Sequence, residues 1–196
     1  MEAMLGILVG VSLAAATGFR VFVPMLVASV AVRADYVNVI ESFEWLGSDA
    51  AVVAFAAATA AEVAAYFVPW LDNALDSLAS PAAIVAGTLL SGSMMVDLDP
   101  WLRWSLALVA GGGAAGIIQG SSVVTRAASS VTTAGFGNPA VSFGEAGGAT
   151  ALSILAVAAP LVAVLIVVAL IGMIVGFFTR ARRRRTANGQ RQRSRE

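Results

Sequence analysis

The chain of 196 residues contains no cysteine and no histidine, and its twelve basic residues are all arginine, so lysine is absent as well. Without cysteine there are no disulfides and no thiol chemistry, and without histidine the usual ligands of zinc and haem are also gone. Histidine proton relays are excluded for the same reason. Proton, ion or ligand chemistry must therefore use carboxylates, arginine, hydroxyl groups or the backbone, and we expect no metal and no cofactor.

Charge is also scarce, because only 12% of the residues are charged while 59% are hydrophobic and the mean hydropathy is +0.85. Soluble domains contain about 45–50% apolar residues. A soluble fold of this length could not hide so much apolar side chain. The sequence therefore predicts an all-α, polytopic integral membrane protein whose helices form one bundle.

Hydrophobic runs separated by turn-forming residues predict about five membrane segments. Ser48, Ser80-Pro81 and Asp99-Pro100 are typical helix starts, since they place a capping side chain at or just before the first helical position. The third segment is barely long enough to cross a bilayer, so either a full span or a re-entrant segment is open. The five segments are 3–32, 50–70, 81–97, 101–119 and 148–179.

Two of these segments carry signs of a broken helix. Gly18 and Pro24 flank Arg20 in the first segment, and we expect an interrupted or re-entrant helix near Gly18 and a corresponding one near Gly120. The last segment is longer than the hydrocarbon core, so it should tilt, with a kink at Pro160. Interrupted helices in corresponding halves of a chain are where many transporters place their sites.

Eight of the twelve arginines lie between residues 180 and 195. Arginine directly after an apolar helix indicates the cytoplasmic side, so we divide the chain into a membrane domain (1–179) and a disordered cytoplasmic tail (180–196). Five spans then place the N-terminus outside, Arg33 and Arg103 at cytoplasmic ends, and residues 71–80 outside. The tail suits anionic lipid headgroups. It lacks the interleaved aromatic residues of nucleic-acid motifs, so no nucleic-acid partner is expected.

Glu62 lies in the middle of the second segment, where a charged side chain must face protein or water. Tyr66 falls on the same helical face, and Arg20 is the natural partner of Glu62 or of an anionic ligand. These three residues make a candidate ligand or transport site, with a purely structural hydrogen bond or ion pair as the alternative.

Arg126 is the counterpart in the second half of the chain, accompanied by Gln119 and by hydroxyl side chains at Ser121, Ser122 and Thr125. Together these groups suit an anion-accepting or water-filled cavity. A solvated loop arginine is the alternative.

Two further groups have weaker claims. Asp72 and Asp76 lie four residues apart, which suits a cation site or a hydrated acidic helix end. The other group is made of glycines at four-residue spacing, the pattern of a glycine zipper through which helices approach closely. They would pack inside the bundle, in a homo-oligomer or against another membrane protein, and they are Gly112, Gly116, Gly120, Gly172 and Gly176.

Three stretches carry a resemblance to a known family: GFRVFVP, AEVAAYFVPWLDNALDSLASP and GGGAAGIIQGSSVVTRAASSVTTAGFGNPAVS. Together they resemble the bacterial membrane-protein family catalogued as domain of unknown function 4126, over most of the chain except the tail. The resemblance implies a multi-pass protein of the bacterial inner membrane with polar motifs around Arg20, Glu62, Asp72, Asp76 and Arg126. It implies no activity.

We find no phosphate-binding glycine loop, nucleophile elbow or metal motif, so an enzyme is not expected. The leading hypothesis is a small transporter or channel for an ion or small solute with a polar site inside the membrane. A structural or accessory membrane subunit is one alternative. A lipid-handling protein is another, and it would require a lateral opening towards the bilayer near Arg20 or Arg126.

Overall fold

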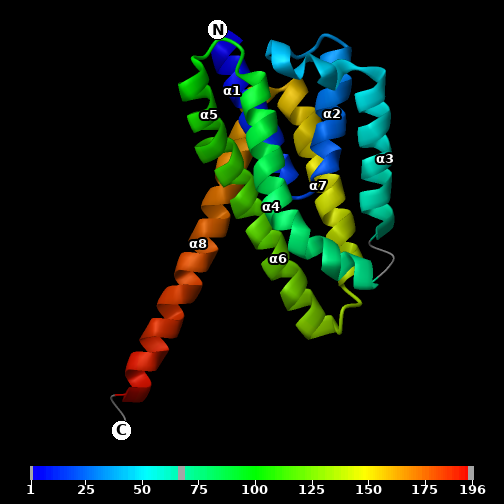
Figure 1. The fold of residues 1–196 in the computed structure, drawn as a ribbon. Helices are drawn as coiled ribbons and strands as arrows, with labels where there is room; N and C mark the ends of the chain where they lie inside the picture. Colours follow the sequence, from blue (N-terminus) through cyan, green and yellow to red (C-terminus); the bar gives the residue numbers. More distant parts are fainter. Residues whose placement is uncertain (1, 66–68, 194–196) are drawn as a thin grey trace.

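The computed structural model describes residues 2–65 and 69–193, with side chains described outside positions 2, 69–77, 182 and 184–193. No strand occurs in the described part of the chain, so the all-α prediction is confirmed (Figure 1). The helices are α1 (Glu2–Thr17), α2 (Phe22–Arg33), the 3-10 helix η1 (Glu41–Gly47), α3 (Asp49–Ala65), α4 (Pro69–Met94), α5 (Pro100–Leu106), the π-helix η2 (Ala107–Gly112), α6 (Gly113–Thr133), α7 (Asn138–Ala158) and α8 (Pro160–Arg193).

The first two helices form a hairpin whose tip lies inside the bundle. In Figure 1, α1 runs from the N-terminus into the molecule and α2 returns to the same end. Gly18 lets the tip of the hairpin approach α6 closely. Any larger residue would place its Cβ only 2.5 Å from the Ala115 carbonyl oxygen of α6. Thr17 Oγ1 donates a hydrogen bond to the Ala83 carbonyl oxygen of α4, 3.0 Å away. The segment predicted over 3–32 is thus interrupted close to Gly18, as its sequence indicates, and it consists of two shorter helices instead of one span.

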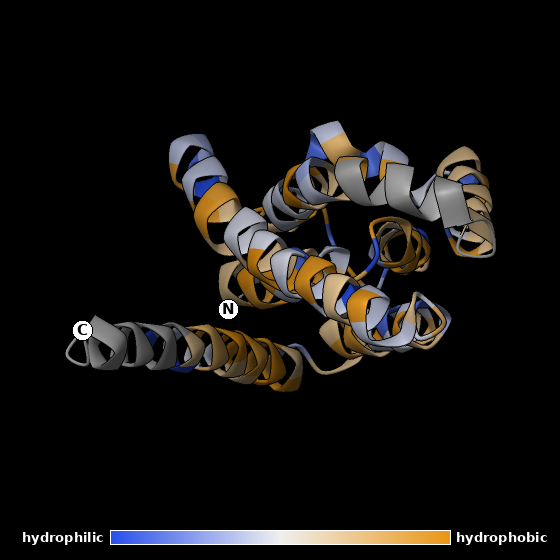
Figure 2. Ribbon diagram, turned by 90° about the horizontal axis from the view of Figure 1, so that it is seen from below, coloured by the Kyte–Doolittle hydropathy of each residue, from blue (hydrophilic) through white to orange (hydrophobic). Residues whose placement is uncertain are grey.

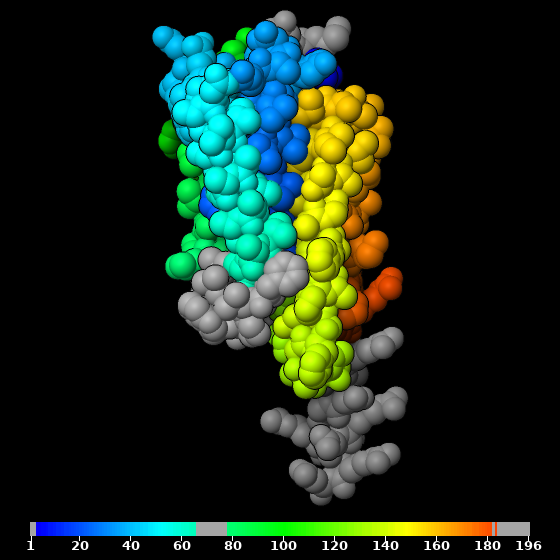
Figure 3. All heavy atoms as spheres, turned by 90° about the vertical axis from the view of Figure 1, so that its right-hand side faces the viewer, coloured from blue at the N-terminus to red at the C-terminus, as the bar shows by residue number. Residues whose placement is uncertain are grey.

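The centre of the bundle is built around α1. Its residues 13–17 are completely buried, and α1 packs against α4, α6, α7 and α8. Small side chains let these helices approach closely, because four of the five residues are alanine or threonine. On the other side of the hairpin, α2 lies between α3 and α7 (Figure 3).

Between residues 100 and 133, α5, η2 and α6 follow one another without a gap. Asp99 caps this stretch, as predicted, by accepting a hydrogen bond of 2.9 Å from the Trp101 amide. Gly120 lies inside α6, so the interruption predicted there is wrong. The departure from α-helical geometry occurs earlier, at η2, where Gly111 packs against Ser91 of α4.

The segment predicted over 148–179 consists of parts of two helices. Ala159 leaves helical geometry with φ −146° and ψ 68°, and α7 and α8 run in opposite directions on either side of it. Pro160 therefore begins a helix instead of kinking one. Asn138-Pro139 begins α7, with the proline in its first turn. Because α8 continues to Arg193, the predicted boundary at residue 179 does not coincide with a helix end, and the division into membrane domain and tail stays a prediction.

The third predicted segment begins too late. α4 starts at Pro69 and contains Pro81 in its interior, so the start predicted at Ser80-Pro81 is wrong and residues 71–80 are helical instead of a connection. Ser48, by contrast, accepts a hydrogen bond of 3.1 Å from the Ala51 amide and caps α3 as predicted.

Three stretches of the described chain are long and apolar enough to cross a membrane: Pro100–Thr133, Asn138–Ala158 and Pro160–Ala181. A fourth results if η1 and α3, which meet at a bend of 65°, are counted as one span. The apolar part of α8 is visible as the orange half of that helix in Figure 2. The described helices thus give three or four candidate spans, where the sequence predicted about five.

The connections gather at two ends of the bundle. The N-terminus, the α2–α3 connection and the α4–α5 connection lie at one end in Figure 1, while the α6–α7 turn and the end of α8 lie at the other. Arg33 closes α2, and Arg103 donates to the Met95 carbonyl oxygen just after α4. Both therefore lie at the end opposite the arginine tail, and the prediction that they share its side is wrong.

Candidate binding site

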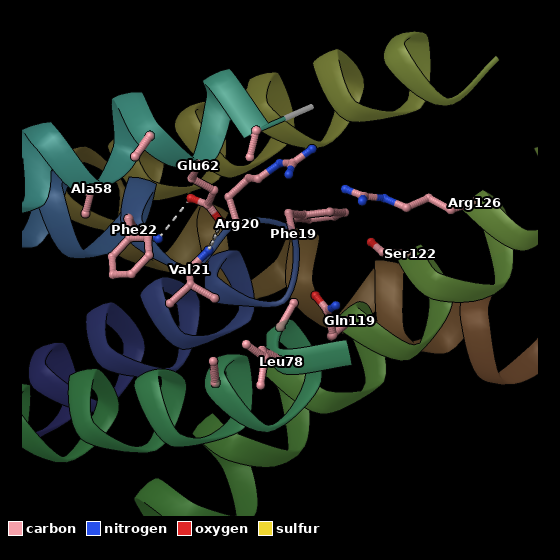
Figure 4. Close-up of a pocket in the computed structure, with 14 residues that line it drawn as sticks. Phe19, Arg20, Val21, Phe22, Ala58, Glu62, Leu78, Gln119, Ser122 and Arg126 are labelled. Atoms are coloured by element: carbon pink, nitrogen blue, oxygen red, sulfur yellow. Dashed lines mark hydrogen bonds between the residues drawn. The ribbon is translucent and has the colours of Figure 1, made fainter. Parts of the chain in front are cut away.

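A cavity of about 490 Å³ lies where the tip of the α1–α2 hairpin meets α3, α4 and α6. Pockets for drug-sized ligands have volumes of about 300–1,000 Å³. Residues 19–22 of the tip form one wall, and α3, α4 and α6 supply the others. Four of the five predicted site residues are brought together here, namely Arg20, Glu62, Gln119 and Arg126 (Figure 4).

Both arginines bind the same carboxylate. Arg20 is 2% exposed, and its Nη2 donates to Glu145 Oε2 at 2.9 Å and to the Ser142 carbonyl oxygen at 3.0 Å, both on α7. Arg126 is 7% exposed and contacts Glu145 through Nε, at 3.3 Å from Oε1, and through Nη2. Glu145, itself buried, thereby joins the hairpin tip and α6 to α7. Charged pairs inside a membrane domain need such mutual compensation.

Glu62 makes a different contact from the ion pair that the sequence suggests. Its Oε1 and Oε2 accept hydrogen bonds from the Val21 and Phe22 amides at 3.0 and 3.2 Å (Figure 4). These amides open α2, whose own N-cap residue, Val21, makes no side-chain cap. A helix N-terminus carries partial positive charge and unpaired N–H groups, so the carboxylate satisfies both. Glu62 therefore caps α2 from the neighbouring helix α3.

Gln119 and Ser122 are polar residues of the cavity whose side chains make no hydrogen bond within the described part of the protein. They are only 6% and 7% exposed, they lie on α6, and in Figure 4 they flank the space between Phe19 and Arg126. Neither side chain has a hydrogen-bond partner among the described residues. Their polar atoms are not sealed inside the protein but remain accessible from the cavity. These two side chains are therefore the groups that a water molecule or a ligand would satisfy.

Three predicted site residues lie in the part of the chain that the structure does not describe in full. Tyr66 lies outside the described residues, as do the side chains of Asp72 and Asp76. Glu145 is the important residue that the sequence argument did not select. Its signal was a single carboxylate in an otherwise apolar and small-residue helix, the same signal that pointed to Glu62.

The glycines divide into two groups. A Cβ at Gly112 or Gly116 would meet Thr88 or Ile84 of α4, so these two glycines face a neighbouring helix. Gly120, Gly172 and Gly176 have no atom within 4 Å of such a Cβ among the described residues, and helix packing at these three positions stays a prediction.

A second cavity, of about 410 Å³, lies near the opposite end of α1. Leu5, Gly6 and Val9 form its α1 wall, and Asn38 and Asp97 contribute polar groups from the connections. The two cavities are thus at opposite ends of the same helix, with the buried residues 13–17 of α1 next to the first.

Apolar helices of this length and number, enclosing a cavity with charged residues, indicate a membrane-embedded protein of the all-α class. A family model described as "Domain of unknown function (DUF4126)" matches residues 7–180, so the chain belongs to this family, as its motifs suggest. No curated protein and no solved structure matches the chain significantly.

Proposed function

We propose that the protein is a membrane transport protein that binds its substrate in the cavity at the tip of the α1–α2 hairpin. The observation that carries this proposal is the pair Gln119 and Ser122, whose polar atoms are accessible from the cavity and make no hydrogen bond among the described residues. Polar side chains placed in this way are typical of small-molecule sites, where a few polar groups orient the ligand in a largely apolar pocket.

The packing around α1 favours a carrier over an open channel. Residues 13–17 are completely buried directly above the hairpin tip, so the cavity ends against a closely packed helix. The second cavity lies beyond that packed layer, at the other end of α1. A substrate bound at the tip would therefore need a movement of the helices to reach the opposite side, which is how alternating-access carriers work.

The choice of variants decides how well this proposal is tested. Arg20 and Glu62 hold the hairpin to α7 and α3, so their substitution would disturb the fold as well as any ligand. Gln119→Leu removes the amide but keeps the volume approximately constant, and it breaks no side-chain hydrogen bond among the described residues. Ser121→Ala is the matched control, because Ser121 neighbours Ser122 but donates to the Ile118 carbonyl oxygen within α6.

The experiment is native mass spectrometry of the protein released from lipid nanodiscs, followed by counterflow in proteoliposomes with the molecule found. We expect a bound small molecule in the wild type and in Ser121→Ala, its loss in Gln119→Leu, and counterflow that follows the same order. An empty wild-type protein, or equal binding and flux in Gln119→Leu, would contradict the proposal.

An accessory subunit is the second candidate, favoured by α8. Few residues of its apolar part, Pro160–Ala181, are buried in the bundle, and Gly172 and Gly176 lie on open surface. Such a face suits lipid or a partner helix. A membrane protein that copurifies with the wild type and with Gln119→Leu alike, and is lost in Gly172→Leu, would support this candidate instead.

A further inference from the structure

The cavity is amphipathic. Its α3 wall consists of Ala58, Ala61 and Ala65 on either side of Glu62, and its α4 wall of Leu78, Ala79 and Ala82. On the other walls, the polar side chains Gln119, Ser122 and Arg126 belong to α6 and Arg20 to the hairpin tip, while Glu62 of α3 is held by the Val21 and Phe22 amides. A ligand that fills this space must therefore have an apolar part along α3 and α4 and a polar part at α6.

The apolar walls reach the outer surface of the bundle. Leu78 is 66% exposed, and Ala61 and Ala82 are exposed as well, although all three line the cavity. In a helical membrane protein, exposed alanine and leucine on the side of the bundle contact acyl chains. The α3 and α4 walls therefore make the space between these two helices the candidate entrance from the bilayer.

The polar end offers mainly hydrogen-bond donors. Arg20 and Arg126 share the single carboxylate of Glu145, so these three side chains carry one net positive charge beside the cavity. Gln119 and Ser122 add an amide and a hydroxyl group. Both oxygens of Glu62 accept from backbone amides of α2. Guanidinium groups recognise carboxylates and phosphates better than neutral acceptors. An anionic headgroup therefore fits this end better than a cationic one.

From these three observations we propose that the substrate is a single-chain anionic amphiphile, of which a long-chain carboxylate is the simplest example. It enters between α3 and α4, its chain lies along the alanine-lined walls, and its headgroup binds Gln119 and Ser122 beside Arg126. This inference rests on the proposed function, because it names the substrate of the same cavity. The volume of about 490 Å³ suits one chain and a small headgroup and is of drug-like size.

The test measures binding of radiolabelled hexadecanoate to the purified protein, with unlabelled competitors that differ only in the headgroup or the chain. We expect hexadecanoate to compete best, hexadecanol about tenfold less well, and hexadecyltrimethylammonium and hexanoate least. Gln119→Leu should weaken hexadecanoate binding about tenfold, while Ser121→Ala leaves it unchanged. Equal competition by hexadecanol or hexadecyltrimethylammonium would overturn the anionic headgroup, and equal competition by hexanoate would overturn the apolar chain.

The lateral wall is tested separately with a pair of alanines on α3. Ala61 lines the cavity, whereas Ala60 is exposed and does not line it, so Ala61→Leu should fill the space and abolish hexadecanoate binding while Ala60→Leu should not. Equal binding in both variants would overturn the entry between α3 and α4. Specific binding without any flux in proteoliposomes would leave this inference standing and contradict transport. Flux of a polar solute that depends on Gln119, without hexadecanoate binding, would support transport and overturn the inferred substrate.

Discussion

At the scale of single residues, Glu62 shows how an intramembrane carboxylate can be required by the fold. Its two oxygens satisfy the first amides of α2, which no side chain of α2 itself caps. Capping side chains contribute about 0.5–2 kcal/mol. Glu62→Ala should therefore lower the free energy of unfolding by about 1–2 kcal/mol, and Glu62→Gln by less because an amide oxygen still accepts one bond.

Thermal unfolding in detergent measures this difference. Glu44→Ala serves as the control, since Glu44 is an exposed glutamate of η1. The order of unfolding temperatures should be Glu44→Ala above Glu62→Gln above Glu62→Ala. Identical temperatures for the two alanine variants would show that the cap contributes nothing to stability.

Glu145 should be the most sensitive charged residue of the bundle, because it serves Arg20 and Arg126 at once. Removing one partner of a buried ion pair typically costs about 3–5 kcal/mol, since the other charge stays buried. Glu145→Gln affects two guanidinium groups, whereas Arg126→Gln leaves the pair of Arg20 and Glu145 in place. Unfolding by sodium dodecyl sulfate should therefore rank Glu145→Gln as less stable than Arg126→Gln, and the opposite order would contradict the shared carboxylate.

The sequence located most of these residues but not their partners. Glu62 and Arg20 are conspicuous because each is a charge in an apolar run, and such charges must face protein wherever the helices go. Which groups they meet depends on where the chain turns. The hairpin at residues 18–21 turns the start of α2 towards Glu62 and Arg20 towards α7, and no local pattern specifies that pairing.

At the scale of helices, the closest packing is between α1 and α4, where small residues face one another. A Cβ at Gly10 would lie 2.8 Å from the Ser91 carbonyl oxygen, and one at Gly6 would clash with the Met94 carbonyl oxygen. Because these are backbone atoms, α1 would have to move away from α4. Overpacking of this kind costs about 1–3 kcal/mol. We expect Gly10→Ala to lower stability by that amount.

Gly120→Ala is the matched control within α6, since its Cβ would meet no atom within 4 Å among the described residues. Alanine is favoured over glycine inside a helix by about 1 kcal/mol, so this variant should be neutral or slightly more stable. Chemical unfolding of both variants in the same detergent measures the two changes. A stability loss at Gly120 as large as that at Gly10 would point to a contact that the isolated chain does not make.

Helix ends were predictable where polar residues mark them and not where the apolar run is continuous. Ser48 and Asp99 cap helices as their sequences indicate. The reversal at Ala159 lies between two apolar stretches, so hydropathy alone joins α7 to α8 into one segment. Pro81 gave the opposite error, because a proline is tolerated inside a helix when neighbouring groups compensate for the lost hydrogen bond.

At the scale of the whole molecule, the two ends of the bundle differ in charge. Arg33 and Arg103 lie at the end that contains the N-terminus, together with six carboxylates of the α2–α3 and α4–α5 regions: Asp35, Glu41, Glu44, Asp49, Asp97 and Asp99. The other end carries the arginines that follow residue 179. Arginine excess marks the cytoplasmic side of membrane proteins. We therefore still expect a cytoplasmic C-terminus and an external N-terminus, and in that orientation Arg33 and Arg103 would lie on the external side.

This orientation can be tested directly because the chain has no cysteine of its own. Asn38→Cys places a thiol at the acidic end, beside the second cavity, and Thr133→Cys places one at the exposed end of α6, by the α6–α7 turn. In intact cells of a bacterial host, a membrane-impermeant maleimide should label Asn38→Cys and should label Thr133→Cys only after permeabilisation. The reverse pattern would place the arginine-rich end outside. Labelling of both residues in intact cells would contradict the separation of the two ends by a membrane.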